Sequence, residues 1–531
     1  MRLLLRFSII DFIVIVFITL VVISWAYQSD SYGNISLARY IQFVFLYCIA
    51  RVLYSFFSHT KSLFIISIIL LCILESVIGI SQYVRYLRSD FILFSCNGTF
   101  NNPGPYGGFL ALCISILIPY VLFGENAIIK RLSVISIILA LLVLPSTLSR
   151  ASFLSVGCSL LLLAFKSEKI YCFVRRHWLF AVLSILICSL SAYYIKKPSA
   201  DGRFLMNKIS LMMMKQNFIT GVGMGNFASE YGKNQAEYFS IIMKDNGDDI
   251  AWKNINERER MVADCPRKAF NEYLQIGVEN GFFSMISFVL LIIISILFSY
   301  KDNQMEISCG LLCLSIFAFF SYPYDFLLFI IVLSFLVAGC SSHQKMSKLN
   351  CALLSFLLIG SVFIAPSIID SIKREKNFTL QSFETKKWYD NGRYDYVVQD
   401  NCLVDYKEIN NVEFLFIYGK ALSETGDYIK SDSVLLQGTR LSSDPMFWIV
   451  MGNNSLSMKK YREAEERYKY AFYMVPNRMY PLYKLAYLYY VEGNYHMFSE
   501  MLEKIDSFVP KVESEKTESM KNKLFQLKQT L

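Results

Sequence analysis

Long apolar runs, each about as long as a membrane-crossing helix, fill the first two-thirds of the chain and constrain its fold most strongly. Eleven such runs lie between residues 1 and 368: 7–27, 38–57, 62–81, 105–123, 132–148, 151–165, 178–195, 274–299, 307–322, 325–340 and 349–367. About 20 apolar residues in a helix span the hydrocarbon of a bilayer with every backbone hydrogen bond satisfied. We therefore predict an all-α, polytopic membrane domain of about 11 spans over residues 1–368.

The basic residues between these runs predict the orientation of the chain. Short cytoplasmic loops hold most Lys and Arg residues, and this holds if the N-terminus is cytoplasmic: Arg2, Arg6, Lys61, Lys130, Arg131, Lys166, Lys169, Arg175, Arg176, Lys301, Lys345 and Lys348 then lie inside. An odd number of spans places residues 369–531 outside, in the periplasm of a cell with two membranes. Four unusual polar segments also fall outside and indicate one site there: 101–108, 148–152, an insert at 196–271, and 321–325.

The C-terminal part, 369–531, is rich in Lys, Glu, Tyr and Asn, and it repeats. Tyr394, Tyr428, Tyr461 and Tyr495 follow short turns at intervals of 34, 33 and 34 residues, the period of a tetratricopeptide repeat. About four stacked copies would form an α-solenoid that binds a protein partner and does no chemistry itself. An unspecific helical domain is the alternative.

Charge and cysteine usage exclude several function classes. The net charge of +9 is explained by the loops between spans, and no nucleic-acid-binding motif is present. The 13 cysteines form no CxxC pair or Cys/His cluster, so we expect neither a metal site nor a cofactor. Cys96 and Cys265 lie in predicted outer loops, where an oxidising compartment would permit a disulfide.

Two arginines are candidates for binding an anion at the outer face. Arg150 begins a span, and Arg203 follows Asp-Gly just after a span. A guanidinium matches a pair of phosphate oxygens, and an arginine at membrane depth is costly unless it has a function. Two such groups would hold a pyrophosphate and stabilise its charge as it leaves. Snorkelling to the interface is the alternative for both.

Two glycine-containing segments suit contact with an anion or sugar. Gly223 lies in a GxGxG run whose backbone N–H groups would face an anion, although a tight turn explains the glycines more simply. The run does not follow a strand, so a dinucleotide-binding fold is excluded. Asn102 precedes a predicted helix and would serve a substrate or only cap that helix.

A group of polar residues enters the span at 274–299. Glu272, Gln275 and Glu279 are spaced i, i+3 and i+7, so they share one helix face. Carboxylates entering a membrane are costly unless they face a cavity or a partner. The functional interpretation is an acceptor-hydroxyl site with one of the carboxylates as base; the structural one, equally supported for Glu272 and favoured for Glu279, is hydrogen bonding between helices.

Together these segments resemble the O-antigen ligase superfamily of bacterial membrane glycosyltransferases over roughly residues 60–340. The resemblance is carried, in order, by GISQY, FNNPGPYGGFL, LSRAS, DGRF with GVGMGNF, and FNEYLQIGVENG. It implies transfer of a glycan from a polyprenyl diphosphate carrier to a hydroxyl acceptor at the outer face of the bacterial inner membrane, without a metal. Lipid A core is the acceptor of ligases, whereas relatives use protein hydroxyls or another glycan.

On this resemblance, Arg150 and Arg203 hold the diphosphate, while Asn271 and Gln275 contact substrate. One position departs from the family pattern, because Phe270 stands where the family usually has histidine. None of the four histidines falls near the predicted site. The arginine-assisted leaving group then suffices, or Asp264, Glu272 or another carboxylate takes the proton.

Three rivals remain beside a ligase. A polymerase of repeat units and a protein O-oligosaccharyltransferase belong to the same class. A non-catalytic membrane anchor for a repeat scaffold belongs to another, but it does not need intramembrane Arg and Glu on one side. A transporter is disfavoured because no duplicated halves are visible.

Overall fold

The computed structural model describes residues 8–27, 31–87, 96–100, 102–166, 176, 197–244, 250–340, 382–529 and 531. These residues form helices and no strand, which confirms the all-α prediction for the described part of the chain. The chain divides into two compact units. The first unit contains residues 1–27, 36–195 and 270–366, and the second contains residues 28–35, 196–269 and 367–531.

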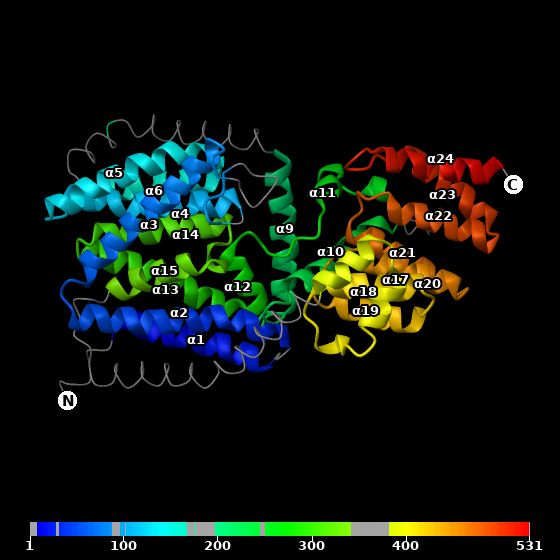
Figure 1. The fold of residues 1–531 in the computed structure, drawn as a ribbon, viewed down its shortest axis with the longest axis horizontal. Coiled ribbons are helices and arrows are strands. Elements are labelled where there is room, and N and C mark those ends of the chain that lie inside the picture. The colour runs from blue at the N-terminus through cyan, green and yellow to red at the C-terminus, as the bar shows by residue number, and fades with distance from the viewer. Residues whose placement is uncertain are drawn as a thin grey trace. The chain divides into compact units, whose positions relative to one another are not determined.

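The first unit is a bundle of apolar helices (Figure 1). Its elements are α1 (Ile9–Tyr27), α2 (Ser31–Phe56), α3 (Thr60–Tyr83), α4 (Pro103–Phe123), α5 (Ala127–Val143), η1 (Leu144–Thr147), α6 (Arg150–Lys166), α12 (Glu272–Asn280), α13 (Phe282–Lys301), α14 (Met305–Phe320), η3 (Pro323–Asp325) and α15 (Leu327–Cys340). Helix α4 packs against α3, α5, α6 and α14, and 78% of its apolar window is buried. It therefore forms the centre of this part of the bundle.

Six of the described helices are long and apolar enough to cross a membrane. They are α1, α2 from Ser36, α3, α4, α5 continued through η1, and α13. Helices α14 and α15 are apolar but shorter, and α6 has 17 residues. The predicted spans at 178–195 and 349–367 lie outside the described residues. The chain is thus a multi-pass helical membrane protein, and the number of eleven spans stays a prediction.

The single span predicted at 274–299 is wrong, because two helices occupy this stretch. Helix α12 ends at Asn280 and α13 begins at Phe282. Between them Gly281 has a φ of 87°, a left-handed backbone that a residue with a Cβ rarely adopts. Broken helices at membrane depth are tolerated where they are buried in protein or line a cavity, and α12 meets that condition.

A buried ion pair joins α1 to α2. Arg51 Nε lies 3.3 Å from Asp11 Oδ1, and the hydroxyl of Tyr47 donates to the same carboxylate. Both charged side chains are essentially inaccessible to solvent. Burying two paired charges costs less free energy than burying one charge alone. The two helices therefore meet in the arrangement that keeps Asp11 and Arg51 paired.

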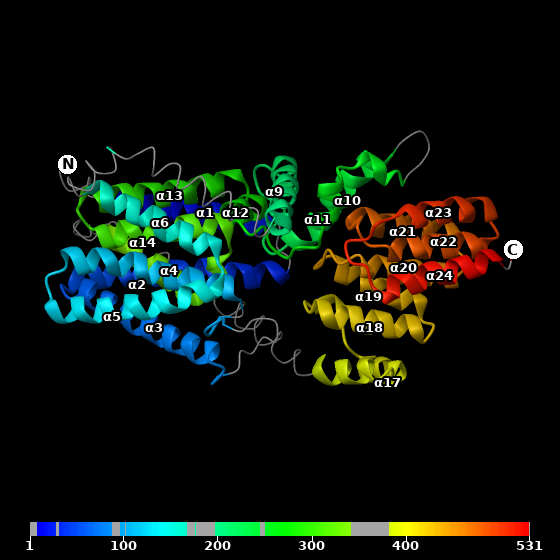
Figure 2. The same ribbon diagram turned by 90° about the horizontal axis from the view of Figure 1, so that it is seen from above.

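The second unit contains the insert and the C-terminal helices. Its insert elements are α9 (Lys197–Gln216), α10 (Phe227–Met243), η2 (Trp252–Asn254) and α11 (Glu257–Val262). The C-terminal elements are a helix at 382–390, α17 (Tyr394–Asp400), η4 (Tyr406–Glu408), α18 (Val412–Glu424), α19 (Tyr428–Thr439), α20 (Met446–Ser457), α21 (Tyr461–Met474), α22 (Tyr480–Glu492), α23 (Tyr495–Ser507) and α24 (Glu515–Gln529). Figure 2 shows the C-terminal helices, coloured yellow to red, from a second direction.

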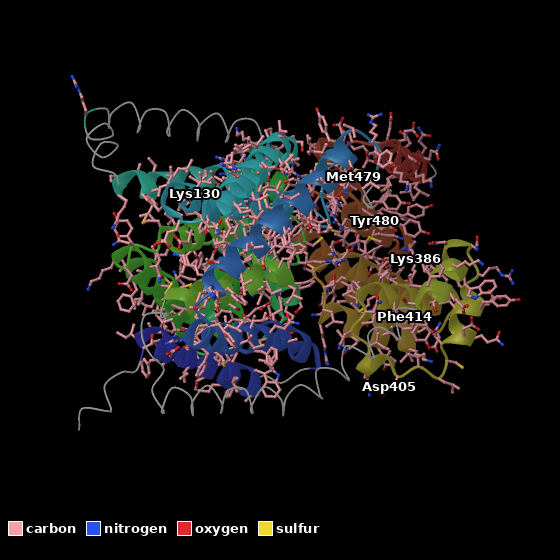
Figure 3. All side chains as sticks on the ribbon, turned by 60° about the vertical axis from the view of Figure 1, so that its left-hand side comes forward. Lys130, Lys386, Asp405, Phe414, Met479 and Tyr480 are labelled. Atoms are coloured by element: carbon pink, nitrogen blue, oxygen red, sulfur yellow. The ribbon has the colours of Figure 1, made fainter. Side chains whose placement is uncertain are left out.

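The repeated tyrosines mark corresponding places in successive helix pairs. Tyr394, Tyr428, Tyr461 and Tyr495 are the first residues of α17, α19, α21 and α23. Helices α19, α21 and α23 each pack on the helix before them, α17 packs on α18, and the helices from α18 to α23 pack mainly on their neighbours along the chain. Figure 3 labels Phe414 in α18, which belongs to a buried cluster with Tyr418 and Val434, and Tyr480 at the start of α22. The 34-residue period is therefore a period of helix pairs.

The insert packs with the C-terminal helices. The domain division drawn from the sequence counted 196–271 with the membrane domain, whereas contacts group 196–269 with 367–531. Helix α10 lies against α21, and the buried residue Ala236 of α10 clusters with Met474 and Val475. Apolar surface on the insert is buried there, which a loop without a partner would leave in water.

Close packing between paired helices predicts a strong effect at Gly452. A Cβ added there would lie 2.5 Å from the ring of Tyr468, which is fully buried. We expect Gly452→Ala to lower the free energy of unfolding by about 1–3 kcal/mol, measured by thermal unfolding of the purified protein. Gly202→Ala is the matched control, because its nearest contact is 3.8 Å; equal melting temperatures for the two variants would contradict the packing.

Candidate active site

Helix α12 carries the polar face that the sequence predicts. Asn271 caps its N-terminus, because its side-chain oxygen accepts from the backbone N–H groups of Tyr273 (3.1 Å) and Leu274 (3.2 Å). The residue before the cap, Phe270, has a φ of 49°, and Gly281 ends the helix. Two left-handed positions therefore fix a nine-residue helix with its polar face turned into the first unit.

A small cavity lies beside this face. Glu272, Gln275 and Glu279 all line it, which confirms that the three residues share one side of the helix. The remaining lining residues come from other helices: Phe17, Arg39, Tyr40, Phe43, Ile276, Phe288, Tyr324, Ile330 and Leu333. The cavity holds about 50 Å³, enough for a few water molecules or one functional group, but not for a whole sugar.

Both carboxylates are buried and hydrogen-bonded. Glu272 is 6% exposed and Glu279 is 3% exposed. Glu272 Oε1 accepts from the backbone N–H of Tyr324 at 3.0 Å, and Glu279 Oε1 accepts from Gln275 Nε2 at 2.6 Å. Both glutamates thus face one cavity within a largely apolar bundle.

Arg39 brings a positive charge to the same cavity. Its guanidinium pairs with Asp325 of η3, and the neighbouring Tyr40 hydroxyl accepts from Asn280 Nδ2 at 3.0 Å. Helix α2, η3 and α12 therefore meet around two glutamates, one arginine and one aspartate. Such an arrangement can accept a proton at a carboxylate and stabilise a negative charge at the guanidinium.

The family comparison covers the core of this arrangement. Residues 135–289 match the family model described as O-antigen ligase. This segment is similar to the O-antigen ligase family. The match supports the superfamily resemblance seen in the sequence, and the family suggests glycan transfer of the O-antigen ligase or polymerase type. No curated protein and no solved structure matched the chain in the same comparisons.

The matched segment includes all but one of the predicted site residues. They are Arg150, Arg203, Gly223, Asp264, Asn271, Glu272, Gln275 and Glu279. Asn102 lies before the matched segment, as does the cavity residue Arg39, and Asp325 lies after it. The cavity is therefore completed by helices outside the matched segment.

Arg150 is the first residue of α6 and is half-buried. It follows a strained turn in which Leu148 has a φ of 48°. The hydroxyl of Ser152 donates to that of Ser149 at 2.6 Å, so the start of α6 is held by short polar contacts. Strained backbone often accompanies functional sites, and both Leu148 and Phe270 lie in segments that carry the family resemblance.

Arg203, Gly223 and Asp264 belong to the second unit. Arg203 lies on α9 and is half-buried. Gly221, Gly223 and Gly225 have φ values of 75°, 95° and 78°, so each of these positions requires glycine for its backbone. The glycine cluster is thus a tight turn, and its proposed contact with an anion stays a prediction.

Asp264 has a partner that keeps it ionised. Lys511 Nζ lies 3.3 Å from its Oδ2, and the backbone N–H of Cys265 donates to Oδ1 at 3.0 Å. Burial opposes the charge, but these two contacts outweigh it and lower the pKa of Asp264. A carboxylate with a lowered pKa is a weaker base, so the ion pair with Lys511 makes Asp264 a poorer candidate for that role.

Phe270, where the resemblance leads us to expect histidine, makes an aromatic contact. The Phe270 ring packs edge-on against Tyr322, with centroids 5.1 Å apart. The two histidines in the described part of the chain, His59 and His496, lie just before α3 and in α23. Phe270 therefore anchors the start of α12 without supplying a proton acceptor.

The structure also describes Asn102 and the two cysteines of the predicted outer loops. Asn102 caps α4, because its side chain accepts from the N–H of Gly104 at 2.8 Å; its contact with a substrate stays a prediction. Cys96 and Cys265 are both free thiols. Cys96 is buried with its Sγ 3.5 Å from the carbonyl of Gly79, while burial raises the pKa of Cys265 to about 11. A disulfide between these two cysteines stays a prediction.

Sequence reasoning missed Arg39, which predicts a testable effect. The signal was present, since Arg39 lies at the start of the second apolar run. We expect Arg39→Ala to reduce glycan transfer at least about tenfold, because misplaced active-site groups cost rate steeply. Arg39→Lys keeps the charge and should retain more activity than Arg39→Ala. Transfer is measured against the amount of protein in the membrane; equal activity of Arg39→Ala and wild type would exclude a role for this cation.

Proposed function

We propose that the protein transfers a glycan from a polyprenyl diphosphate carrier to a hydroxyl acceptor, with lipid A core as the acceptor, at the periplasmic face of the bacterial inner membrane. The match of residues 135–289 to the O-antigen ligase family carries this proposal. The buried carboxylates and arginine around α12 support it, because a multi-pass membrane bundle needs no such cluster for packing alone. The N-terminus is cytoplasmic and the C-terminal helices are periplasmic in this proposal.

The proposed reaction is a single displacement at the anomeric carbon. The acceptor oxygen forms a bond to that carbon as the bond from carbon to the diphosphate oxygen breaks. The acceptor proton passes to the Glu272 carboxylate, and the polyprenyl diphosphate leaves with the electron pair. Arg150 and Arg203 bind the diphosphate and offset its growing charge.

The other candidate residues have supporting roles in this proposal. Glu279 and Gln275 hydrogen-bond to each other at 2.6 Å and present the acceptor hydroxyl to Glu272. Arg39 lines the same cavity and compensates the two glutamates. Asn271 and Asn102 hold the starts of α12 and α4 where the substrates enter, and the turn at Gly223 contacts the donor.

We also propose that the C-terminal helix pairs are tetratricopeptide repeats. Their helices begin at tyrosines spaced by 33 or 34 residues and pack in chain order. A repeat stack of this kind recruits a protein partner.

Deletion of the gene in its host tests the proposal. Loss of glycan from lipopolysaccharide, with carrier-linked glycan retained, is the expected result. Shortened glycan chains would instead indicate a polymerase, and loss of glycan from proteins would indicate a protein O-oligosaccharyltransferase. Unchanged glycans of all three kinds would leave only the membrane-anchored scaffold.

A further inference from the structure

Within the second unit, buried polar side chains join the insert to the C-terminal helices. We call this contact the docking seam and define it by Gln235, Trp252 and Arg260 of the insert and Asn477 of the C-terminal helices. Gln235 is 1%, Arg260 2% and Asn477 3% exposed. Their bonds reach main-chain atoms across the seam, so the seam specifies one arrangement of two backbones.

Arg260 has contacts on both sides of the seam. Its Nη2 donates to the carbonyl of Val509 at 2.9 Å, and its Nη1 donates to the carbonyl of Pro476 at 3.4 Å. Glu257 pairs with it at 2.7 Å, and its guanidinium lies 4.8 Å from the ring centre of Phe508. A buried arginine is tolerated only when it is paired and hydrogen-bonded in this way.

Asn477 reaches in the opposite direction. Its Nδ2 lies within hydrogen-bonding distance of three insert carbonyls: Arg260 (3.1 Å), Met261 (3.2 Å) and Ala263 (2.7 Å). Each is an acceptor, so the seam requires a donor at this point. From the insert, Gln235 donates across the seam to the carbonyl of Met474 and, within the insert, to that of Asp264.

Apolar packing supplies the remaining contact. The Trp252 ring meets Phe508 with centroids 5.4 Å apart and Phe472 at 6.3 Å. Helix α10 approaches the C-terminal helices so closely that a Cβ on Gly232 would lie 2.6 Å from Ser443 Cβ. No side chain larger than hydrogen fits at that point.

The seam is linked to Arg203 through α11. Arg258 of α11 pairs with Asp201 of α9, and Glu259 pairs with Lys208 of α9 at 2.8 Å. Partial burial by itself would raise the pKa of Glu259 and lower that of Lys208. Their hydrogen bonding and mutual attraction outweigh burial, so the pKa of Glu259 is lowered and that of Lys208 is raised. Arg203 lies between these two anchor points on α9.

We propose that the C-terminal helices are a clamp that positions the insert, and with it Arg203, for binding of the donor diphosphate. Arg260 and Asn477 are the positioning residues of this clamp. The inference rests on the proposed function for its effect on transfer, but the clamp itself is independent of that function. The C-terminal part is then a working part of the transfer machinery as well as a surface for partners.

Hydrogen exchange of the full-length protein in detergent tests the clamp. Asn477→Asp replaces the donor with a carboxylate that faces three carbonyls, so amides at 250–263 should exchange at least about tenfold faster. Asn453→Asp is the matched control in the same helical stack, because Asn453 Oδ1 accepts from the Tyr468 hydroxyl at 2.8 Å and a carboxylate still accepts. Unchanged protection of 250–263 in Asn477→Asp overturns the clamp.

Two further variants separate positioning from folding. Gly232→Leu places a large side chain between the two sides of the seam without altering a hydrogen-bonding group. The amides at 250–263 should again exchange faster. Asn477→Gln keeps the carboxamide and should restore part of both the protection and the transfer. Each variant is compared at equal abundance in the membrane, with exchange in the first unit unchanged.

Glycan transfer in the deletion strain completes the experiment. We expect Asn477→Asp and Gly232→Leu to reduce transfer at least about tenfold, with partial rescue by Asn477→Gln. Released amides with full transfer would overturn the positioning role while leaving the proposed function intact. If wild-type protein itself transfers no glycan, the proposed function fails and hydrogen exchange alone decides the clamp.

Discussion

Glu272→Gln should reach the membrane in normal amounts and transfer glycan at least about 100-fold more slowly than wild type. The side-chain oxygen of glutamine can still accept from the N–H of Tyr324, a bond that Glu272 makes at 3.0 Å, so α12 keeps its place. The charge and the basic oxygen are lost, however, and general base catalysis contributes about 10²–10⁴-fold to rate. Glycan transferred per molecule of membrane protein is the measurement.

Glu306→Gln is the matched control. Glu306 is another buried glutamate of the first unit, but it pairs with Lys61 and does not line the cavity. This variant should retain most of its activity once its abundance is taken into account. If both variants transfer glycan at similar rates, the carboxylate of Glu272 is not the base and burial alone explains its effect.

Arg150→Ala should also slow glycan transfer, by about 100-fold or more. A preorganised cation at a developing negative charge is worth about 10²–10³-fold in rate, and alanine removes it from the start of α6. Arg150→Lys should recover only part of the rate, because an ammonium cannot grip two phosphate oxygens at once. Accumulation of carrier-linked glycan is the accompanying readout.

Arg131→Ala is the control for Arg150→Ala, because it removes one positive charge outside the proposed site. Arg131 is exposed near the start of α5, beside Lys130, which Figure 3 labels. Its loss should leave transfer unchanged. Full activity in Arg150→Ala would remove the diphosphate-binding role from that arginine.

Much of the architecture follows from local patterns. The helices that begin at Tyr394, Tyr428, Tyr461 and Tyr495 were visible as a 34-residue period, because each repeat contains its own turn and paired helix. The shared face of Glu272, Gln275 and Glu279 follows from 3.6 residues per turn and needs no tertiary information.

The break at Gly281 could not be predicted by counting apolar residues. Apolar side chains continue on both sides of this glycine, so the run reads as one span, whereas the backbone turns at a φ of 87°. Hydropathy measures how well side chains tolerate lipid and contains no information on backbone dihedral angles.

Contacts between segments far apart in the chain could not be predicted from the sequence either. Arg39 and Asp325 are 286 residues apart, and the Asp11–Arg51 pair joins two helices that each look merely apolar. The seam at Arg260 and Asn477 uses main-chain carbonyls, which every residue possesses, so no side-chain pattern marks the partner.

The most direct test of the account measures carrier-linked and acceptor-linked glycan together in a deletion strain that produces either wild-type protein or Glu272→Gln. We expect that wild type moves glycan from the carrier to the acceptor, while Glu272→Gln leaves it on the carrier at normal protein abundance. Equal amounts of acceptor-linked glycan in the two strains would contradict it.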